Sequence, residues 1–190
     1  MNRLAVALAS CSTQYCNGKE SSVSLFALEE GAFLCSLLQG KDVVEIGCGY
    51  DAGLSRELLL LGAKLYLGID INTCAVESAK YKRKHKSNGT LHHARFICDD
   101  PINVLETIAT DASVRPFVLS TAVFDDAILR DRKYARMLVT AIGRATKSGD
   151  YTLHSALSFE KYFGDLFEDA GFEYSGDALE RLFGLMRKTR

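Results

Sequence analysis

Short apolar runs alternate with longer amphipathic segments along most of the chain, and this alternation limits the fold more than any other feature. The apolar runs predict strands at residues 42–46, 64–69, 94–98, 116–120 and 151–156. Apolar residues spaced three and four apart predict helices at residues 23–39, 52–61, 73–84, 100–108, 126–146 and 159–170. Strands that alternate with helices favour a mostly parallel sheet with both faces covered.

The end of the chain breaks this alternation. Residues 172–174 and 182–186 are short apolar runs with no long helix between them. Strands joined by so short a connection pair in antiparallel fashion. The sequence therefore predicts an α/β fold with a doubly wound, seven-stranded sheet, mostly parallel and ending in an antiparallel strand pair.

Chain length and charge narrow the classes of protein. The chain has 190 residues, a formal net charge of -1 and 25% charged residues. This length fits one domain, which we place at residues 23–190, after a polar N-terminal segment at residues 1–22. The near-neutral balance provides no global attraction to nucleic acid or to an anionic membrane.

The six cysteines are scattered without metal-ligand spacing, which favours free thiols in a reducing compartment. We therefore expect a cytoplasmic protein. One alternative stays open, because Leu8-Ala9-Ser10-Cys11 resembles a bacterial lipoprotein cleavage box. The apolar run before it is short for a secretory segment, whose core spans roughly 7–15 residues. The segment at residues 1–22, with Tyr15, is either a lid over the site or a tail.

A glycine-rich loop, Gly47-Cys48-Gly49-Tyr50-Asp51-Ala52-Gly53, joins the first predicted strand of the sheet to the next helix. Glycines there let the backbone approach a ligand that a Cβ atom would block. The next strand ends in Asp70, where a carboxylate can accept hydrogen bonds from both hydroxyls of a ribose. The loop also satisfies the dinucleotide fingerprint, so a nicotinamide cofactor remains an alternative at this point.

Three segments resemble motifs of the class I S-adenosylmethionine (SAM)-dependent methyltransferases, a family with a Rossmann-like fold. Residues 43–49 resemble the first motif, an apolar strand and an acidic residue before the glycines. Residues 66–72 resemble the second, and residues 96–101 resemble the third. Residues 168–173 and the final strand pair resemble the usual ending of the family, so the resemblance covers about residues 23–190.

The resemblance implies SAM as the cofactor, with Asp70 on the ribose and Asp100 on the adenine amino group. It also implies transfer of a methyl group to O or N of a small-molecule metabolite by in-line displacement. The residues expected to bind the cofactor are Glu45, Gly47, Cys48, Gly49, Asp51, Asp70, Ile71, Asp99, Asp100, Pro101 and Thr121.

Acidic residues favour SAM over a nicotinamide dinucleotide. Glu45 stands two residues before Gly47, and a carboxylate suits the ammonium and sulfonium of SAM. Asp51 occupies the place of the family's third glycine. Asp51 either widens the loop or binds the ammonium group of SAM. Its negative charge would be poorly placed beside a pyrophosphate. A dehydrogenase would also need a second domain for its substrate.

Methyl transfer requires alignment of the nucleophile and, in some enzymes, a general base. His154, near the carboxyl end of the fifth predicted strand, is a candidate base or a hydrogen-bonded structural histidine. Asp125 is a second candidate base; the alternative makes Asp125 and Asp126 the N-cap and first turn of the helix at residues 126–146. No metal site is predicted.

We expect a small-molecule substrate and no nucleic-acid or membrane partner. The basic run at residues 81–86 reads as a solvated helix end, and the chain lacks the motifs of nucleobase methyltransferases. A second copy of the chain that completes the pocket remains open. Two further alternatives are a methyltransferase-like domain that binds cofactor or a partner without catalysis, and an NAD(P)-dependent oxidoreductase.

Overall fold

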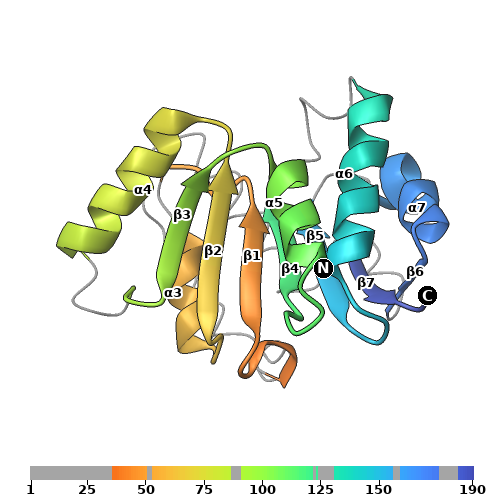
Figure 1. Cartoon of the computed structure of the whole chain (residues 1–190), viewed down its shortest axis with the longest axis horizontal. Helices are drawn as coiled ribbons and strands as arrows, with labels where there is room; N and C mark the ends of the chain where they lie inside the picture. Colours follow the sequence, from red (N-terminus) through yellow and green to blue (C-terminus); the bar gives the residue numbers. More distant parts are fainter. Residues whose placement is uncertain are drawn as a thin grey trace.

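A computed structural model describes residues 36–50, 53–86, 91–121, 123, 131–155, 159–175 and 184–190. Within these ranges it contains one seven-stranded sheet with the order β3-β2-β1-β4-β5-β7-β6 (Figure 1). The strands are β1 (Asp42–Ile46), β2 (Leu65–Asp70), β3 (Ala94–Cys98), β4 (Phe117–Thr121), β5 (Tyr151–Ser155), β6 (Phe172–Tyr174) and β7 (Leu185–Lys188).

The first five strands pair in parallel, and β7 runs antiparallel to both of its neighbours, β5 and β6. The predicted fold class is therefore confirmed, including the antiparallel ending. Parallel strands must be covered on both faces, because the helical crossovers between them return over those faces. This requirement explains the near-continuous apolar composition of β1, whose last four residues are all buried.

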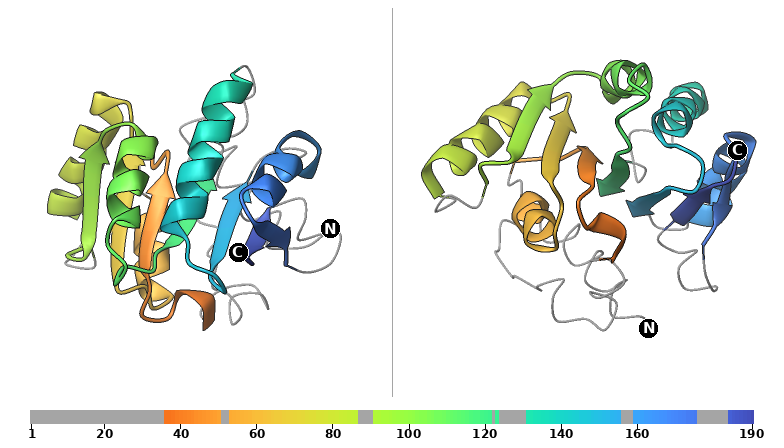
Figure 2. Two further views of the ribbon diagram at one scale, coloured as in Figure 1. Left: turned by 45° about the vertical axis from the view of Figure 1, so that its right-hand side comes forward. Right: turned by 60° about the horizontal axis from the view of Figure 1, so that its bottom comes forward.

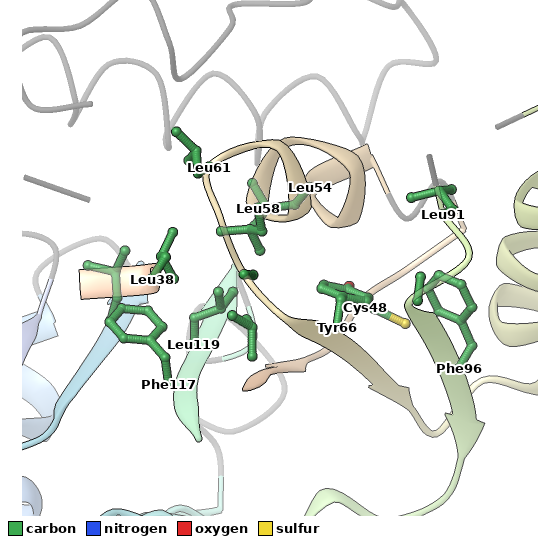
Figure 3. Packing of buried hydrophobic residues seen from close by; sticks show 14 of the residues in the cluster. Leu38, Cys48, Leu54, Leu58, Leu61, Tyr66, Leu91, Phe96, Phe117 and Leu119 are labelled. Carbon is green, nitrogen blue, oxygen red and sulfur yellow. The ribbon is translucent and has the colours of Figure 1, made fainter. Parts of the chain in front are cut away.

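Helices form a layer on each side of the sheet (Figures 1 and 2). The helices α3 (Gly53–Leu60) and α4 (Thr73–Lys86) contribute to one apolar cluster. The helices α5 (Pro101–Ala109), α6 (Arg132–Ala145) and α7 (Phe159–Asp169) contribute to the cluster on the opposite face. Figure 3 shows the first cluster, in which Leu54 and Leu58 of α3 lie over the side chains of the sheet.

Two predicted boundaries are wrong. The helix expected at residues 126–146 begins after Asp131, which is its N-cap and accepts from the amides of Lys133 and Tyr134. Asp125 and Asp126 therefore do not cap this helix, and both lie outside the described residues. Several carboxylates precede the apolar face of α6, and sequence alone does not say which one meets the free amides.

The strand expected at residues 182–186 is β7, displaced toward the C-terminus to Leu185–Lys188. Gly184 comes just before it with a φ of 52°, a left-handed conformation that favours glycine. Most of the helix expected at residues 23–39 lies outside the described residues. Among the described helices, none has both the length and the apolar character needed to cross a membrane.

Gly68 of β2 allows the glycine loop to lie against the sheet. A Cβ atom at this position would be 2.8 Å from the Cβ of Cys48 and 2.9 Å from Cδ1 of Phe96. Figure 3 shows Cys48 between Tyr66 and Phe96. Because packed interiors leave no room for an added methyl group, the absence of a side chain at Gly68 fixes how close the loop comes to β2.

We expect Gly68→Ala to lower the free energy of unfolding by about 1–3 kcal/mol, the usual cost of overpacking a well-filled core. Urea denaturation followed by circular dichroism measures this loss. Arg95→Ala, at an exposed position of the neighbouring strand, is the control and should change stability by less than about 0.5 kcal/mol. Equal stability of the two variants would contradict the tight packing of Cys48 on Gly68.

Candidate functional site

The carboxyl ends of β1, β2 and β3 meet at one edge of the sheet. Their arrowheads point to the same side in Figure 1, and the parallel register pairs Ile46 with Ile69 and Asp70 with Cys98. The segments that follow these strands therefore converge, namely residues 47–50, 71–72 and 99–101. In open α/β sheets such an edge is the usual place for a ligand. The three predicted motifs are thus brought together by strand order.

The glycine loop folds back onto β2. The amides of Gly47 and Cys48 both donate to the carbonyl of Ile69, at 2.8 and 3.1 Å. Gly47 and Gly49 have φ angles of 76° and 64°, in the left-handed region where a Cβ atom is disfavoured. The two glycines are therefore required by the turn itself, before any ligand is considered.

Asp70 joins the glycine loop to the turn after β2. Its Oδ2 accepts from the amide of Gly49 at 2.9 Å, and its Oδ1 accepts from the amide of Asn72 at 2.8 Å. The residue is half-buried. Each carboxylate oxygen has two lone pairs, so both oxygens keep capacity to accept from a ligand hydroxyl. This is the geometry expected of a ribose acceptor at the end of a second strand.

A second contact, which the sequence analysis did not predict, spans the same gap. Nδ2 of Asn72 donates to the hydroxyl of Tyr50 at 3.0 Å. Oδ1 of Asn72 accepts from the amides of Cys74 and Ala75, so this residue also caps α4. Asparagine is one of the residues preferred as an N-cap. The pairing with Tyr50 cannot be read from the sequence, because it depends on the path of the loop.

Ile71, between Asp70 and Asn72, leaves 73% of its surface exposed. A large apolar side chain so exposed beside a polar turn is a surface that a flat apolar ligand can cover. Cys98, at the end of β3, lies on the other side of this turn, with its Sγ 3.7 Å from the carbonyl of Ile71. Ile71 was predicted to bind the cofactor, and its exposure at this edge is consistent with that prediction.

Glu45 lies beneath the loop rather than at the surface. It is only 3% exposed, and the hydroxyl of Tyr66 donates to its Oε2. The thiol of Cys48 lies nearby, and its pKa is raised by burial first, and then by the charges of Glu45 and Asp70. Two carboxylates thus act on one loop side chain, which indicates a negative potential at this point of the loop.

The two aspartates of the third motif, Asp99 and Asp100, make different contacts. Oδ1 of Asp100 accepts from the amide of Ile102 at 2.8 Å and from the Tyr134 hydroxyl at 3.0 Å, so Asp100 is the N-cap of α5. Partial burial and the carboxylate of Asp100 raise the pKa of Tyr134 to about 12. Pro101 is buried in the first turn of the helix.

Asp99 is exposed, and its Oδ1 accepts from the amide of Asp100 at 2.7 Å and from Nδ2 of Asn103 at 3.0 Å. Each of these aspartates accepts two bonds at Oδ1, and no bond to Oδ2 of either is found among the described residues. The two differ in exposure: Asp99 is exposed and Asp100 is half-buried, so Asp99 is the more accessible to a ligand. The sequence predicted both as binding residues but gave the adenine contact to Asp100.

His154 is fully buried, and its Nδ1 lies 2.9 Å from Oγ of Ser120 on β4. Its ring packs against Phe167, with the ring centroids 4.8 Å apart. Burial lowers the pKa of this imidazole from its ordinary value of 6.5 to about 3. A general base must reach a substrate proton, and this ring is enclosed. These surroundings favour the structural alternative for His154 over the catalytic one.

Four other predicted features are described incompletely or not at all. Thr121 ends β4 and pairs with Ser155 across the sheet, at the same carboxyl edge as the glycine loop. Asp51, Asp125 and Tyr15 lie outside the described residues, and their roles stay predictions. Within the described ranges, no group of three or more His, Cys, Asp or Glu side chains could hold a metal ion.

Comparisons with known proteins agree on the fold. No protein-family model matches the chain, and no curated protein sequence matches it. Among solved structures, a magnesium protoporphyrin IX methyltransferase from Synechocystis PCC 6803 with bound SAM is 20% identical, with a TM-score of 0.56 over 83% of this chain and 73% of that one.

Two further solved structures have the same fold. The cyclase SpnF is 14% identical, with a TM-score of 0.54 over 75% of this chain and 56% of that one. The O-MT of StiE is 17% identical, with a TM-score of 0.52 over 80% of this chain and 50% of that one. The protein thus has the class I SAM-dependent methyltransferase fold.

The pKa of His154 is about 3 in the folded protein and near 6.5 in the unfolded chain. Between pH 3 and pH 6.5 the imidazole is therefore protonated in the unfolded chain and neutral in the folded protein. Stability should therefore fall as the pH drops below 6.5. From pH 7 to pH 5 we expect the wild type to lose about 2 kcal/mol more than His154→Gln in urea denaturation. His92→Gln, at an exposed site, is the control and should behave like the wild type.

Proposed function

We propose that this protein binds SAM at the carboxyl ends of β1, β2 and β3 and transfers its methyl group to O or N of a small-molecule metabolite. The observation that carries the proposal is the hydrogen bond between the Gly49 amide and Oδ2 of Asp70, at 2.9 Å. It joins the glycine loop to a carboxylate that keeps capacity to accept from ribose hydroxyls. Bound SAM supplies a methyl group already activated by the sulfonium.

The nucleoside half of SAM fits the turn after β2. Asp70 has lone pairs left to accept from the ribose hydroxyls, and the exposed Ile71 offers an apolar face for the adenine. We propose that Asp99 accepts from the adenine amino group, because Asp99 is exposed whereas Asp100 is half-buried and caps α5. The backbone of Asp100 and Pro101 then borders the base.

The charge at the loop supports a cationic ligand over a dinucleotide. Glu45 and Asp70 both raise the pKa of the Cys48 thiol, after burial, so the potential there is negative. The amides of Gly47, Cys48 and Gly49 already donate to Ile69 and Asp70. A pyrophosphate would meet these carboxylates with few free amides, whereas an ammonium and a sulfonium are attracted.

Alignment of the nucleophile, rather than a fixed general base, is the catalytic contribution we propose. The enclosed His154 is excluded from the role of base in this proposal. Thr121, Asp51 and Asp125 remain candidates for contact with cofactor or substrate. We propose residues 23–190 as the catalytic domain and residues 1–22 as a lid. The free thiols of Cys48, Cys74 and Cys98 support a reducing compartment such as the cytoplasm.

A second candidate function is cofactor binding without methyl transfer. The observation that favours it is the similarity to SpnF, which is named a cyclase although it has this fold. The two candidates share the binding site and differ only in turnover. Binding of SAM without methylation of any acceptor in pools of metabolites would favour the second candidate.

The demethylated product, S-adenosylhomocysteine, should bind saturably and raise the melting temperature of the purified chain. We expect Asp70→Ala to weaken this binding at least about tenfold in isothermal titration calorimetry, because bonds to charged groups contribute about 1.5–3 kcal/mol each. Glu77→Ala, on the exposed face of α4, is the control and should bind like the wild type.

No change in melting temperature with SAM or with its product would contradict the proposal. Quenching or enhancement of NADH fluorescence on addition of the wild-type protein, with no binding of SAM, would instead support an oxidoreductase.

Substitution of the two aspartates of the third motif should affect ligand binding and the free energy of unfolding to different extents. Asp100→Ala removes an N-cap, so we expect a loss of about 1 kcal/mol in the free energy of unfolding. Asp99→Ala should cost less stability and weaken binding of S-adenosylhomocysteine by about tenfold, through loss of one charge-assisted bond. Urea denaturation and calorimetry measure the two effects. If Asp100→Ala loses the larger share of affinity, the adenine contact belongs to Asp100.

A further inference from the structure

A groove of about 330 Å³ lies between α6, α7 and the end of β7, and it is lined by Arg136, Arg144, Lys188 and Asp169 among others. It is far from the glycine loop. Arg187, next to Lys188, pairs with Tyr151 at the start of β5, whereas the loop follows the end of β1. The groove is therefore near the amino ends of the parallel strands, opposite the site proposed for SAM.

Lys188 carries a charge that the described residues do not balance with a carboxylate. The residue is 8% exposed, and its ammonium donates to the carbonyl of Ala170 and lies 4.8 Å from the ring centroid of Phe172. No ion pair of Lys188 with an acidic side chain occurs among the described residues. The carbonyl end of α7 offsets part of the charge.

An ammonium so buried is costly unless an anion pairs with it. Burial and the nearby Arg190 both lower the pKa of Lys188, in keeping with an uncompensated charge. The ammonium has three donors, and the described residues supply one oxygen acceptor, the Ala170 carbonyl. The remaining donors are available to a ligand in the groove.

Two guanidinium groups add to this charge. Arg136 makes one bond to Asp169 at 3.1 Å, and Arg144 makes one bond to Glu106 of α5 at 2.7 Å. All four side chains of these pairs are at least 40% exposed, so water screens the pairing. Each guanidinium has five N–H donors, and its planar fork matches two oxygens of a phosphate. Most of these donors thus have no partner among the described residues.

The floor of the groove is closely packed. A Cβ atom on Gly143 would lie 3.3 Å from both the Cβ and the carbonyl oxygen of Ala170, and 3.5 Å from Nζ of Lys188. Glycine at this position brings α6 close to the end of α7 and holds the ammonium at the base of the groove. The three cations are therefore presented from two elements of fixed separation, α6 and β7.

We propose that this groove is a binding site for a phosphomonoester, whose dianionic phosphate group pairs with Lys188, Arg136 and Arg144. The groove is at the lower end of the volumes usual for small-molecule sites, about 300–1,000 Å³, so it admits more than a bare phosphate ion. The carboxylates of Asp169 and Glu106 at its border disfavour a long polyanion such as RNA, which would have to pass them.

Inorganic phosphate is the probe, titrated against the full chain at constant ionic strength with chloride as the balancing ion. Amide chemical shifts in ¹H–¹⁵N spectra report the position of binding, and the melting temperature reports its strength. We expect saturable shifts at Gly143, Ala170 and Gly171, with Gly47 and Gly49 unchanged. Two sugar phosphates of different size, compared with their unphosphorylated sugars, then test the contribution of the ester group.

The variants Lys188→Met and Arg144→Gln should each weaken phosphate binding about tenfold or more, the loss of one charge-assisted contact. Lys188→Met should melt no lower than the wild type without phosphate, since it removes an unpaired charge from a buried place. Lys133→Met, on α6 but outside the groove, is the matched control and should bind as the wild type does.

Four results would overturn the proposal. The first is the absence of any saturable shift at the groove, and the second is a set of shifts spread over all basic surfaces and shared with chloride. The third is undiminished binding in Arg144→Gln, a variant of an exposed side chain that keeps the fold intact even if Lys188→Met does not. An equal response to a phosphate ester and to its unphosphorylated sugar would exclude the phosphate group as the recognised feature.

Discussion

The contact between Asp70 and the Gly49 amide determines the geometry of the proposed cofactor end. It holds a left-handed glycine turn against the end of a strand, so three loops meet at one place. The close fit of Cys48 over Gly68 supports it from below, because no side chain intervenes between the loop and β2. With a larger residue at Gly68, the loop would move away and the carboxylate would lose its partner.

Polar residues that occupy similar positions in the sequence pattern differ in how deeply the fold buries them. Glu45 is buried under the loop with the Tyr66 hydroxyl, whereas Asp70 at the next strand end stays half-exposed. His154 is enclosed between Ser120 and Phe167, where burial keeps it neutral. Burial therefore separates residues that shape the site from those that can touch a ligand, since a ligand can reach only what the packing leaves exposed.

Opposite charges gather at the two ends of the sheet. Carboxylates gather at the carboxyl ends of β1 and β2, where the proposed ligand is a cation, and they act on the Cys48 thiol. Lys188 and the arginines of α6 line the groove at the other end, where the proposed ligand is an anion. The helices run antiparallel to the parallel strands, so Arg144 and Asp169, near the ends of α6 and α7, lie away from the cofactor edge. The two proposed sites can therefore be tested separately.

The amino-acid pattern alone determined the α/β class, the glycine turn, the position of Asp70 at the end of the second strand and the antiparallel ending, because periodicity and glycine conformation are local properties. Only the tertiary structure decided that Asp131 caps α6, that Asp99 is more exposed than Asp100, and that His154 is enclosed. It also decided the pairing of Tyr50 with Asn72 and the burial of Lys188 with no ion pair to a carboxylate of the described residues. Each of these depends on which distant segments meet across the sheet, and no local pattern in the chain carries that information.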